Sequence, residues 1–306
     1  MMELVFLGTG AGKPSIRRNV TSMALSLVAH GQGVWLFDCG EGTQHQILRS
    51  KVNPSKIEKV FITHLHGDHV FGLPGLLTSR AMSENAQPLS VYGPPGIRAF
   101  VDTVIRLTRS FLTYPLSVVE VAPGVVFEDA AFTVKAQALS HRVECFGFRI
   151  EQADQPGALD MDRLRLMNIS SGPVLKRIKE GETVVLDDGR QIDGRAYVKP
   201  PRAGKVVTIL GDTAPCTQVL DLAAGADVLV HEATLDASLA QKANSRGHST
   251  TLQAAEMARD AHVKRLIVTH ISARYDEKGD AQLLRECQSV FPNTEIAKDF
   301  GVYFIG

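Results

Sequence analysis

Five apolar runs of this chain end directly on a residue that can bind a metal ion, and this repeated pattern limits the fold more than any other feature. Each run is short enough to form a buried strand. In open α/β sheets, the loops that follow the carboxyl ends of the strands gather at one edge. We therefore expect convergence of the side chains that follow these runs, which are His64, His141, Asp212, His231 with Glu232, and His270.

The segment 63–69 reads THLHGDH and is unusually rich in potential ligands. These ligands are His64, His66, Asp68 and His69. Gly67 lets the chain turn tightly because it has no side chain. In such a loop, the first two ligands can project to one side while the last two reach a second point nearby. One loop can therefore serve two metal ions.

The ligand types also limit the metal. Imidazole together with carboxylate favours zinc, with manganese or cobalt as alternatives. Each ion needs about four or five ligands, and a carboxylate has two oxygens with which to bridge. Ligand counting predicts two sites bridged by Asp212, one with His64, His66 and His141 and the other with Asp68, His69 and His270.

The order of elements predicts mixed α/β layers within a single domain that covers residues 1–306. In the first half, apolar runs closed by glycine predict a sheet with hairpins over residues 2–10, 20–29 and 33–40. A helix is expected at 43–53 and a strand at 59–63. From residue 206 onward strands and helices alternate regularly, with strands expected at 206–212, 227–234 and 265–270 and helices between them.

Residues 152–205 differ from the rest of the chain. They contain QPGALD, SSGP and KPPRAGK, which are rich in turn residues and poor in long apolar runs. Residues 151–205 hold ten Lys or Arg against nine Asp or Glu, so their net charge is small. We expect an inserted arm within the domain and not a second core. The alternative is that these residues form a solvated loop without a function.

The overall composition provides no net positive charge that would attract a polyanion. Lys plus Arg and Asp plus Glu number 33 each, so a nucleic acid must be held by a local patch and by bound cations. The chain has no leader-like start and no run of 18 apolar residues, and its four cysteines form no CxxC pair. We expect a cytoplasmic protein with reduced cysteines and no membrane segment.

The HxHxDH motif, followed by later His, Asp and His at strand ends, resembles the metallo-β-lactamase fold. That fold is an αββα sandwich with the metals at one edge. The chain further resembles bacterial ribonuclease Z, a tRNA 3′-endonuclease family also called RNase BN. The matching motifs are FLGTGAG at 6–12, WLFDCGEGTQHQ at 35–46, THLHGDHVFGLPGLL at 63–77, GDT at 211–213, HEAT at 231–234 and THISARY at 269–275.

This resemblance implies a precursor tRNA substrate and two zinc ions held by the predicted ligand sets. It makes Asp68 the group that orients and deprotonates the attacking water. It assigns His248 to the scissile phosphate and the leaving oxygen, with assistance from Glu232; a helix-entry position before Ser249, a predicted N-cap, is the alternative. Arg274 suits phosphate oxygens, or else a surface ion pair.

The resemblance also gives the arm a role. Members of the family use an inserted arm with a Gly-Pro element, here Gly172 and Pro173, to grip tRNA away from the metals, and the arm acts across a homodimer. They often carry a PxKxRN loop that senses the RNA 3′ end. In this chain the loop spans residues 14–19 and has Ile16 in place of the basic residue, with Arg17 adjacent.

Two other functions fit the same motifs. A small-molecule phosphodiesterase or thioester hydrolase would use the same metal ligands on the same fold. A non-catalytic RNA-binding or metal-sensing protein would have lost a ligand or Asp68, and none is missing here. Whether exoribonuclease trimming accompanies endonuclease cleavage stays open.

Overall fold

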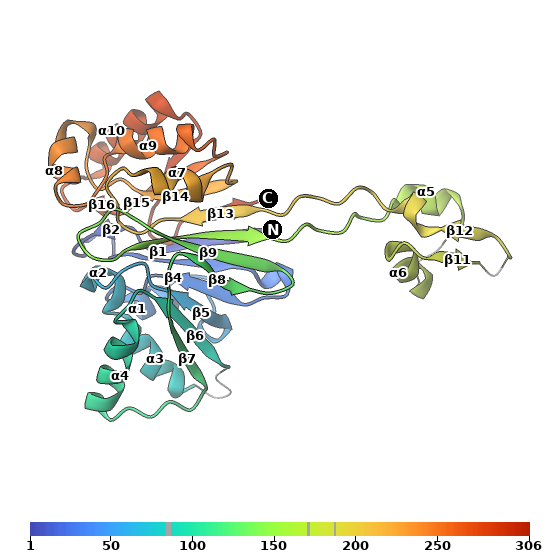
Figure 1. Cartoon of the computed structure of the whole chain (residues 1–306), viewed down its shortest axis with the longest axis horizontal. Helices are drawn as coiled ribbons and strands as arrows, with labels where there is room; N and C mark the ends of the chain where they lie inside the picture. Colours follow the sequence, from blue (N-terminus) through green and yellow to red (C-terminus); the bar gives the residue numbers. More distant parts are fainter. Residues whose placement is uncertain (84–86, 170–171, 187) are drawn as a thin grey trace. The chain divides into compact units, whose positions relative to one another are not determined.

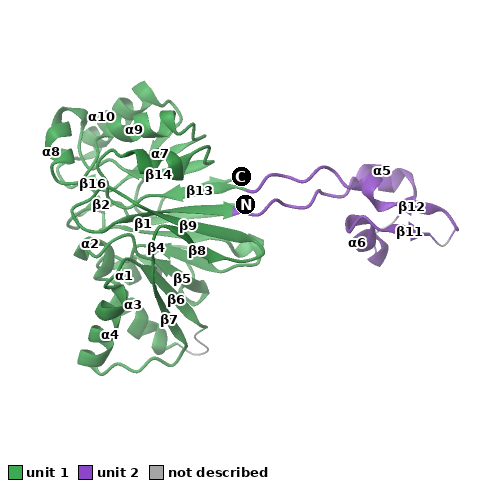
Figure 2. Cartoon of the chain, in the orientation of Figure 1, with its two compact units in different colours: residues 1–151, 205–306 green, residues 152–204 purple. Residues whose placement is uncertain are grey.

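The computed structural model describes residues 1–83, 87–169, 172–186 and 188–306. These residues form two compact units, which Figure 2 distinguishes by colour. The main unit consists of residues 1–151 and 205–306, and the inserted unit consists of residues 152–204.

Seven strands form the first sheet of the main unit, in the spatial order β18-β1-β3-β4-β5-β6-β7. Its first part is antiparallel, whereas β4 to β7 run parallel. The prediction of a sheet with hairpins, made for residues 2–10, 20–29 and 33–40, is confirmed by the antiparallel pairing of β1 with β3 and of β3 with β4. The strands are β1 (Met2–Gly8), β3 (Ser22–Ser26), β4 (Val34–Phe37), β5 (Ile57–Phe61), β6 (Leu89–Gly93), β7 (Leu116–Glu120) and β18 (Val302–Ile305).

The second sheet also has seven strands, in the order β17-β15-β14-β13-β10-β9-β8. Strands β13, β14, β15 and β17 are parallel, as the alternation of strands and helices predicts. A short parallel pair, β2 (Gly10–Ala11) with β16 (Ile271–Ser272), lies apart from both sheets. The strands are β8 (Gly124–Glu128), β9 (Phe132–Ala138), β10 (Phe146–Gln152), β13 (Val206–Ile209), β14 (Val228–Glu232), β15 (Leu266–Thr269) and β17 (Thr294–Ile296).

The two sheets pack face to face over an aromatic core. Phe37 and Phe61 of the first sheet stack with ring centroids 5.0 Å apart, and Phe148 of the second sheet lies 5.3 Å from Phe61. All three side chains are fully buried. Stacked and tilted aromatic pairs of this kind contribute beyond the area they bury. This core holds the two sheets together at a fixed separation.

Helices cover the outer face of each sheet and complete an αββα sandwich (Figure 1). One apolar cluster joins the first sheet to its helices, and another joins the second sheet to its own. The first group comprises α1 (Thr43–Leu48), α2 (Gly67–Val70), α3 (Leu73–Ala81) and α4 (Ile97–Thr108). The second group comprises α7 (Thr217–Ala223), α9 (Thr251–Asp260) and α10 (Glu277–Val290); the short helix α8 (Ala240–Asn244) contributes no residue to this cluster.

The inserted unit has a small apolar core of its own, so the expectation that it lacks a core is wrong. The core residues are Leu164, Ile169, Ile178, Val184 and Ile192. They are spaced singly along short elements, which is why no long apolar run marks them in the sequence. The elements are α5 (Met161–Leu166), α6 (Pro173–Lys179), β11 (Thr183–Val185) and β12 (Gln191–Asp193).

Strand register brings the predicted ligands to one edge of the sandwich. Phe37 at the end of β4 pairs with Phe61 at the end of β5, and Glu232 at the end of β14 pairs with Thr269 at the end of β15. Residues that follow these strands therefore start from the same level. Among the described residues, no helix is both long and apolar enough to cross a membrane.

Candidate metal centre

The ligand-rich loop follows β5 and ends in a single helical turn. His66 precedes α2 in an extended conformation, and α2 then presents Asp68 and His69. The backbone N–H of Cys39 donates to the carbonyl of His69 at 2.8 Å and anchors this turn to the end of β4. Gly67 opens the helix without a positive φ; a Cβ there would lie 2.2 Å from the Phe71 ring. Gly67 therefore leaves room for the exposed Phe71 ring and does not provide the predicted tight turn.

The first predicted ligand set converges on one point. Nδ1 of His66 lies 3.0 Å from Nε2 of His64 and 3.2 Å from Nε2 of His141. Oδ2 of Asp212 lies 3.7 Å from Nε2 of His64 and 3.9 Å from Nε2 of His141. Three imidazole nitrogens and one carboxylate oxygen therefore face a common centre.

The second predicted set converges beside the first. Oδ2 of Asp68 lies 3.6 Å from Nε2 of His69 and 3.4 Å from Nε2 of His270. The other oxygen of Asp212, Oδ1, lies 3.6 Å and 3.5 Å from the same two nitrogens. Asp212 thus directs one oxygen toward each set, as a bridging carboxylate would.

These separations fit metal coordination. Tetrahedral zinc, with bonds of about 2.0–2.1 Å, places neighbouring ligand atoms roughly 3.3 Å apart. These separations between ligand atoms in the two sets lie between 3.0 Å and 3.9 Å, on both sides of this value. Nε2 of His69 is fully buried and has no hydrogen-bond partner among the described residues, which is costly unless a cation occupies that direction. The donor set and its geometry both suit divalent metals such as zinc.

Polar partners hold the opposite side of four of these imidazole rings. Hydrogen bonds join Nδ1 of His69 to Asp38 Oδ2 at 2.8 Å, Nδ1 of His141 to Gly247 O at 2.7 Å, Nδ1 of His270 to Thr234 Oγ1 at 2.9 Å, and Nδ1 of His64 to Thr63 Oγ1 at 3.0 Å. A carbonyl and a carboxylate only accept, so Nδ1 of His69 and His141 carries the proton. Nε2 of both rings is then free to bind a metal ion.

Asp38 is a site residue that the sequence analysis missed. It is buried, it adopts a positive φ of 56°, and its carboxylate holds both His69 and the backbone N–H and hydroxyl of Thr63. A non-glycine residue in this conformation costs energy and is typical of a functional site. The available signal was its position directly after a buried strand, the same signal that identified the histidines.

The surroundings favour the ligand-competent protonation states of His64 and Asp212. Burial and the positive charge of His69 lower the pKa of His64 to about 2. Burial alone would raise the pKa of Asp212, but the charges of His270 and His69 lower it well below its usual range. A neutral imidazole and an ionised carboxylate are the forms that bind metal. Burial would lower the pKa of His69, but the carboxylates of Asp212 and Asp38 outweigh it and raise this pKa well above its usual range, so a metal ion bound there would replace a proton.

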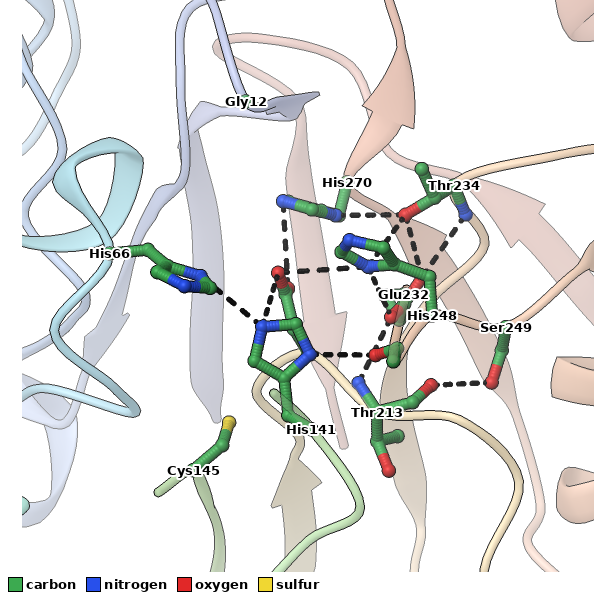
Figure 3. A network of polar contacts seen from close by, with 12 residues as sticks. Gly12, His66, His141, Cys145, Thr213, Glu232, Thr234, His248, Ser249 and His270 are labelled. Atoms are coloured by element: carbon green, nitrogen blue, oxygen red, sulfur yellow. Dashed lines mark hydrogen bonds and ion pairs between the residues drawn. The ribbon is translucent and has the colours of Figure 1, made fainter. Parts of the chain in front are cut away.

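A second polar group adjoins the centre. Oε1 of Glu232 lies 2.9 Å from Nδ1 of His248 and accepts from the Thr213 backbone N–H at 2.9 Å, while Oε2 accepts from Thr234 Oγ1 at 2.6 Å (Figure 3). Burial would lower the pKa of His248, but the hydrogen bond and charge of Glu232 outweigh it and raise this pKa to about 9. His248 also lies 3.7 Å from Oδ2 of Asp212.

The helix that follows His248 begins one residue later than we predicted. The N-cap of α9 is Thr250, which forms a capping box with Gln253, and the prediction of Ser249 is wrong. Ser249 instead donates its hydroxyl proton to the carbonyl of Thr213 at 2.7 Å. This bond ties the His248 segment to the strand end that carries Asp212.

One predicted strand-end ligand is separate from the centre. His231 precedes Glu232 on β14, and its Nδ1 contacts the Glu232 carbonyl at 2.6 Å. Successive residues of a strand point to opposite faces, so both side chains cannot face the metal ligands. His231 belongs to none of the groups of described residues that are able to hold a metal ion.

A cavity of about 260 Å³ opens onto the centre. Arg274 lies in its lining with Lys242 and Arg246, and all three are exposed. Gly12 also lines it, and its backbone N–H donates to Asp68 Oδ2 at 2.8 Å. In the loop at 14–19, by contrast, Ile16 is fully exposed and Arg17 is paired with Asp280 at 2.8 Å.

Comparison with known proteins gives matches along the whole chain. The chain is 57% identical over 300 residues to a ribonuclease BN of Enterobacter sp. (strain 638), covering 98% of each chain. It is similar to the crystal structure of human tRNase Z, short form, with 31% identity, a TM-score of 0.73 and 99% of each chain covered. The metallo-β-lactamase fold protein YhfI of Bacillus subtilis shares the fold, with 19% identity, a TM-score of 0.69 and 99% and 98% coverage. The Anti-Pycsar protein Apyc1 family matches residues 2–101.

Proposed function

The chain belongs to the ribonuclease BN family, and from this premise we propose that it removes the 3′ trailer from precursor tRNA by metal-dependent hydrolysis of one phosphodiester bond. The observation that supports this function best is the pair of ligand sets joined by the two oxygens of Asp212. Beside them lie a paired histidine and glutamate, and a cavity with a basic lining. Such a centre is suited to phosphoryl substrates.

The proposed cofactor is two zinc ions, with manganese or cobalt as alternatives. His64, His66 and His141 would hold one ion, and Asp68, His69 and His270 would hold the other, with Asp212 available to both sets. Zinc ions at these positions would acidify a water molecule, whose pKa falls to ~7 at a single zinc, and would offset charge on the phosphoryl oxygens.

Asp68 orients the attacking water and accepts its proton. Burial would raise the pKa of Asp68, but the hydrogen bond and charge from the neighbouring histidines lower it, so the carboxylate is ionised at neutral pH. Its Oδ2 accepts from the Gly12 backbone N–H, which fixes the orientation of the carboxylate. An ionised, oriented carboxylate at the edge of the cavity is suited to direct the water.

His248 protonates the leaving oxygen. Its Nδ1 faces Glu232 (Figure 3). His248 lines the cavity, so Nε2 is the atom that can donate into it. Glu232 is a positioning residue, since it is buried and reaches the substrate only through the imidazole. With a pKa of about 9, His248 is protonated at neutral pH and is ready to act as a general acid.

The substrate is bound at two places. Arg274 lies in the cavity lining, where its charge interacts with the nearby carboxylate of Asp236 without a direct ion pair among the described residues, and its guanidinium suits the scissile phosphate. The inserted unit, with Gly172 and Pro173 at the start of α6, is the arm that grips the tRNA. Gly172 is exposed, and a Cβ there would contact none of the described residues.

We further propose a cytoplasmic homodimer. The free cysteines support a reducing compartment. An apolar cavity of about 220 Å³ between α1 and α3, bordered by the exposed Leu48, supports association through this face. Light scattering of the protein and of Leu48→Glu tests this: a dimer that the substitution splits is expected, and a wild-type monomer would contradict it.

Product mapping tests the function. The zinc-loaded protein is incubated with a precursor tRNA that carries a 3′ trailer, alongside Asp68→Ala, and product ends are mapped at single-nucleotide resolution. A single cut at the trailer junction, absent in the variant, is expected; a ladder would indicate exoribonuclease trimming. No cleavage of RNA, together with turnover of a thioester or a small phosphodiester, would support the alternative substrates instead.

A further inference from the structure

Two cations at the mouth of the cavity have no role in the function described above. Lys242 lies in α8 and Arg246 follows it, and both line the cavity that contains Asp68, Asp212 and His248. Both are exposed. Exposed basic residues usually belong to a solvated face, so their position must be tested against further observations.

The segment that carries them is fixed to the metal centre. Ala243 is buried, and its carbonyl accepts from the backbone N–H of both Arg246 at 2.9 Å and His248 at 3.0 Å. Gly247 has a φ of +75°, and its carbonyl binds His141 Nδ1. A Cβ at Gly247 would lie 2.7 Å from this nitrogen, so the segment packs directly against a metal ligand.

This attachment determines where the two charges point. Residues four apart in a helical turn lie on one face, with Cβ atoms about 5–6 Å apart. Lys242 and Arg246 have this spacing, and the cap residue between α8 and Arg246, Ser245, is still in a helical conformation. The two cations therefore stand side by side on the face that borders the cavity.

Neither cation is neutralised by the protein. Among the described residues, no carboxylate forms an ion pair with Lys242 or Arg246, whereas Arg259 and Arg265 elsewhere in the main unit pair with Asp260 and Glu295. Unpaired cations beside a phosphoryl site raise the local concentration of anions. The positive potential at this mouth is thus available to a ligand.

We propose that Lys242 and Arg246 bind the RNA backbone phosphates next to the scissile one and so extend the binding site along the strand. This rests on the proposed function. A single phosphodiester has one negative charge, which two bound metal ions and Arg274 would suffice to neutralise. Two further cations at the mouth therefore match a ligand with several phosphates in a row, which favours an RNA strand over a small diester.

The test compares two double variants on two substrates. Lys242→Ala with Arg246→Ala removes the proposed contacts, and Lys278→Ala with Arg285→Ala removes two exposed charges from α10, outside the cavity lining. Cleavage of precursor tRNA is measured over a range of salt concentrations, and hydrolysis of a small chromogenic phosphodiester is measured in parallel. All four positions are exposed, so neither pair is expected to unfold the protein.

For the first pair we expect KM for the tRNA to rise roughly tenfold, and the slope of log(kcat/KM) against log salt to fall by about 1.4, since each single-strand phosphate contact contributes about 0.7. Turnover of the small diester and the behaviour of the control pair should be unchanged. Equal tRNA kinetics in both pairs would overturn the proposal, as would equal losses on both substrates. If the unmodified enzyme cleaves no RNA, the proposed function fails instead.

Discussion

The metal centre and the inserted unit differ in how their residues are held. At the centre, buried polar groups fix nearly every imidazole, as Asp38 does for His69. In the inserted unit, the core consists of five residues and most ion pairs are exposed, such as Arg177 with Glu182. Exposed pairs contribute little. The comparison indicates that the centre is built for fixed geometry, whereas the inserted unit is held by a small apolar core, one strand pair and a few exposed polar contacts.

Substitution of Asp212, the proposed bridging ligand, should have the largest effect. Asp212→Ala removes an oxygen from both ligand sets, so we expect kcat for precursor tRNA and for a small diester to fall by roughly 10³-fold or more. Steady-state kinetics on both substrates measure this. Asp102→Ala, an exposed carboxylate on α4, is the matched control and should behave as wild type. A variant of Asp212 with near-normal turnover would refute the shared centre.

Loss of the Asp38 carboxylate, the hydrogen-bond partner of His69, should reduce activity less, and added metal should restore it. Asp38→Asn weakens the acceptor for His69 and should lower metal affinity about 10- to 100-fold. Competition with a chelator measures the affinity. Activity should recover when zinc is added in excess. Failure to recover, with normal metal content, would mean that Asp38 does not act through the metal.

Removal of the inserted unit should weaken tRNA binding while it leaves catalysis at the metal centre unchanged. When residues 153–203 are replaced by a short Gly-Ser linker, we expect KM for precursor tRNA to rise roughly tenfold or more, because phosphate and shape contacts are lost. Turnover of the small diester should be retained, since no metal ligand lies in the segment. Parallel losses on both substrates would contradict a binding role for this unit.

The smallest effect is expected within the core of the inserted unit. Ile178→Ala removes a buried side chain and should destabilise this unit by about 2–4 kcal/mol. Hydrogen exchange should then increase over residues 152–204 and remain unchanged in the main unit. The control is Val185→Ala, at a largely exposed position of β11. Increased exchange across both units would show that they unfold together.

The sequence predicted which side chains converge because they lie in the loops that follow strands, and strand ends collect at one sheet edge. It did not predict Asp38, whose role depends on the pairing of β4 with β5 and on a positive φ. It also missed β6, since LSVYG is short and adjoins a turn. The core of the inserted unit escaped prediction because single apolar residues from short elements reveal no period.

The central claim is that two metal ions share Asp212, and a zinc titration of the metal-free protein tests it most directly. Bound zinc is followed by calorimetry, and cleavage of a small phosphodiester is measured at each addition. The account predicts binding that saturates at two equivalents per chain, with full activity only then. Saturation and full activity at one equivalent would contradict it.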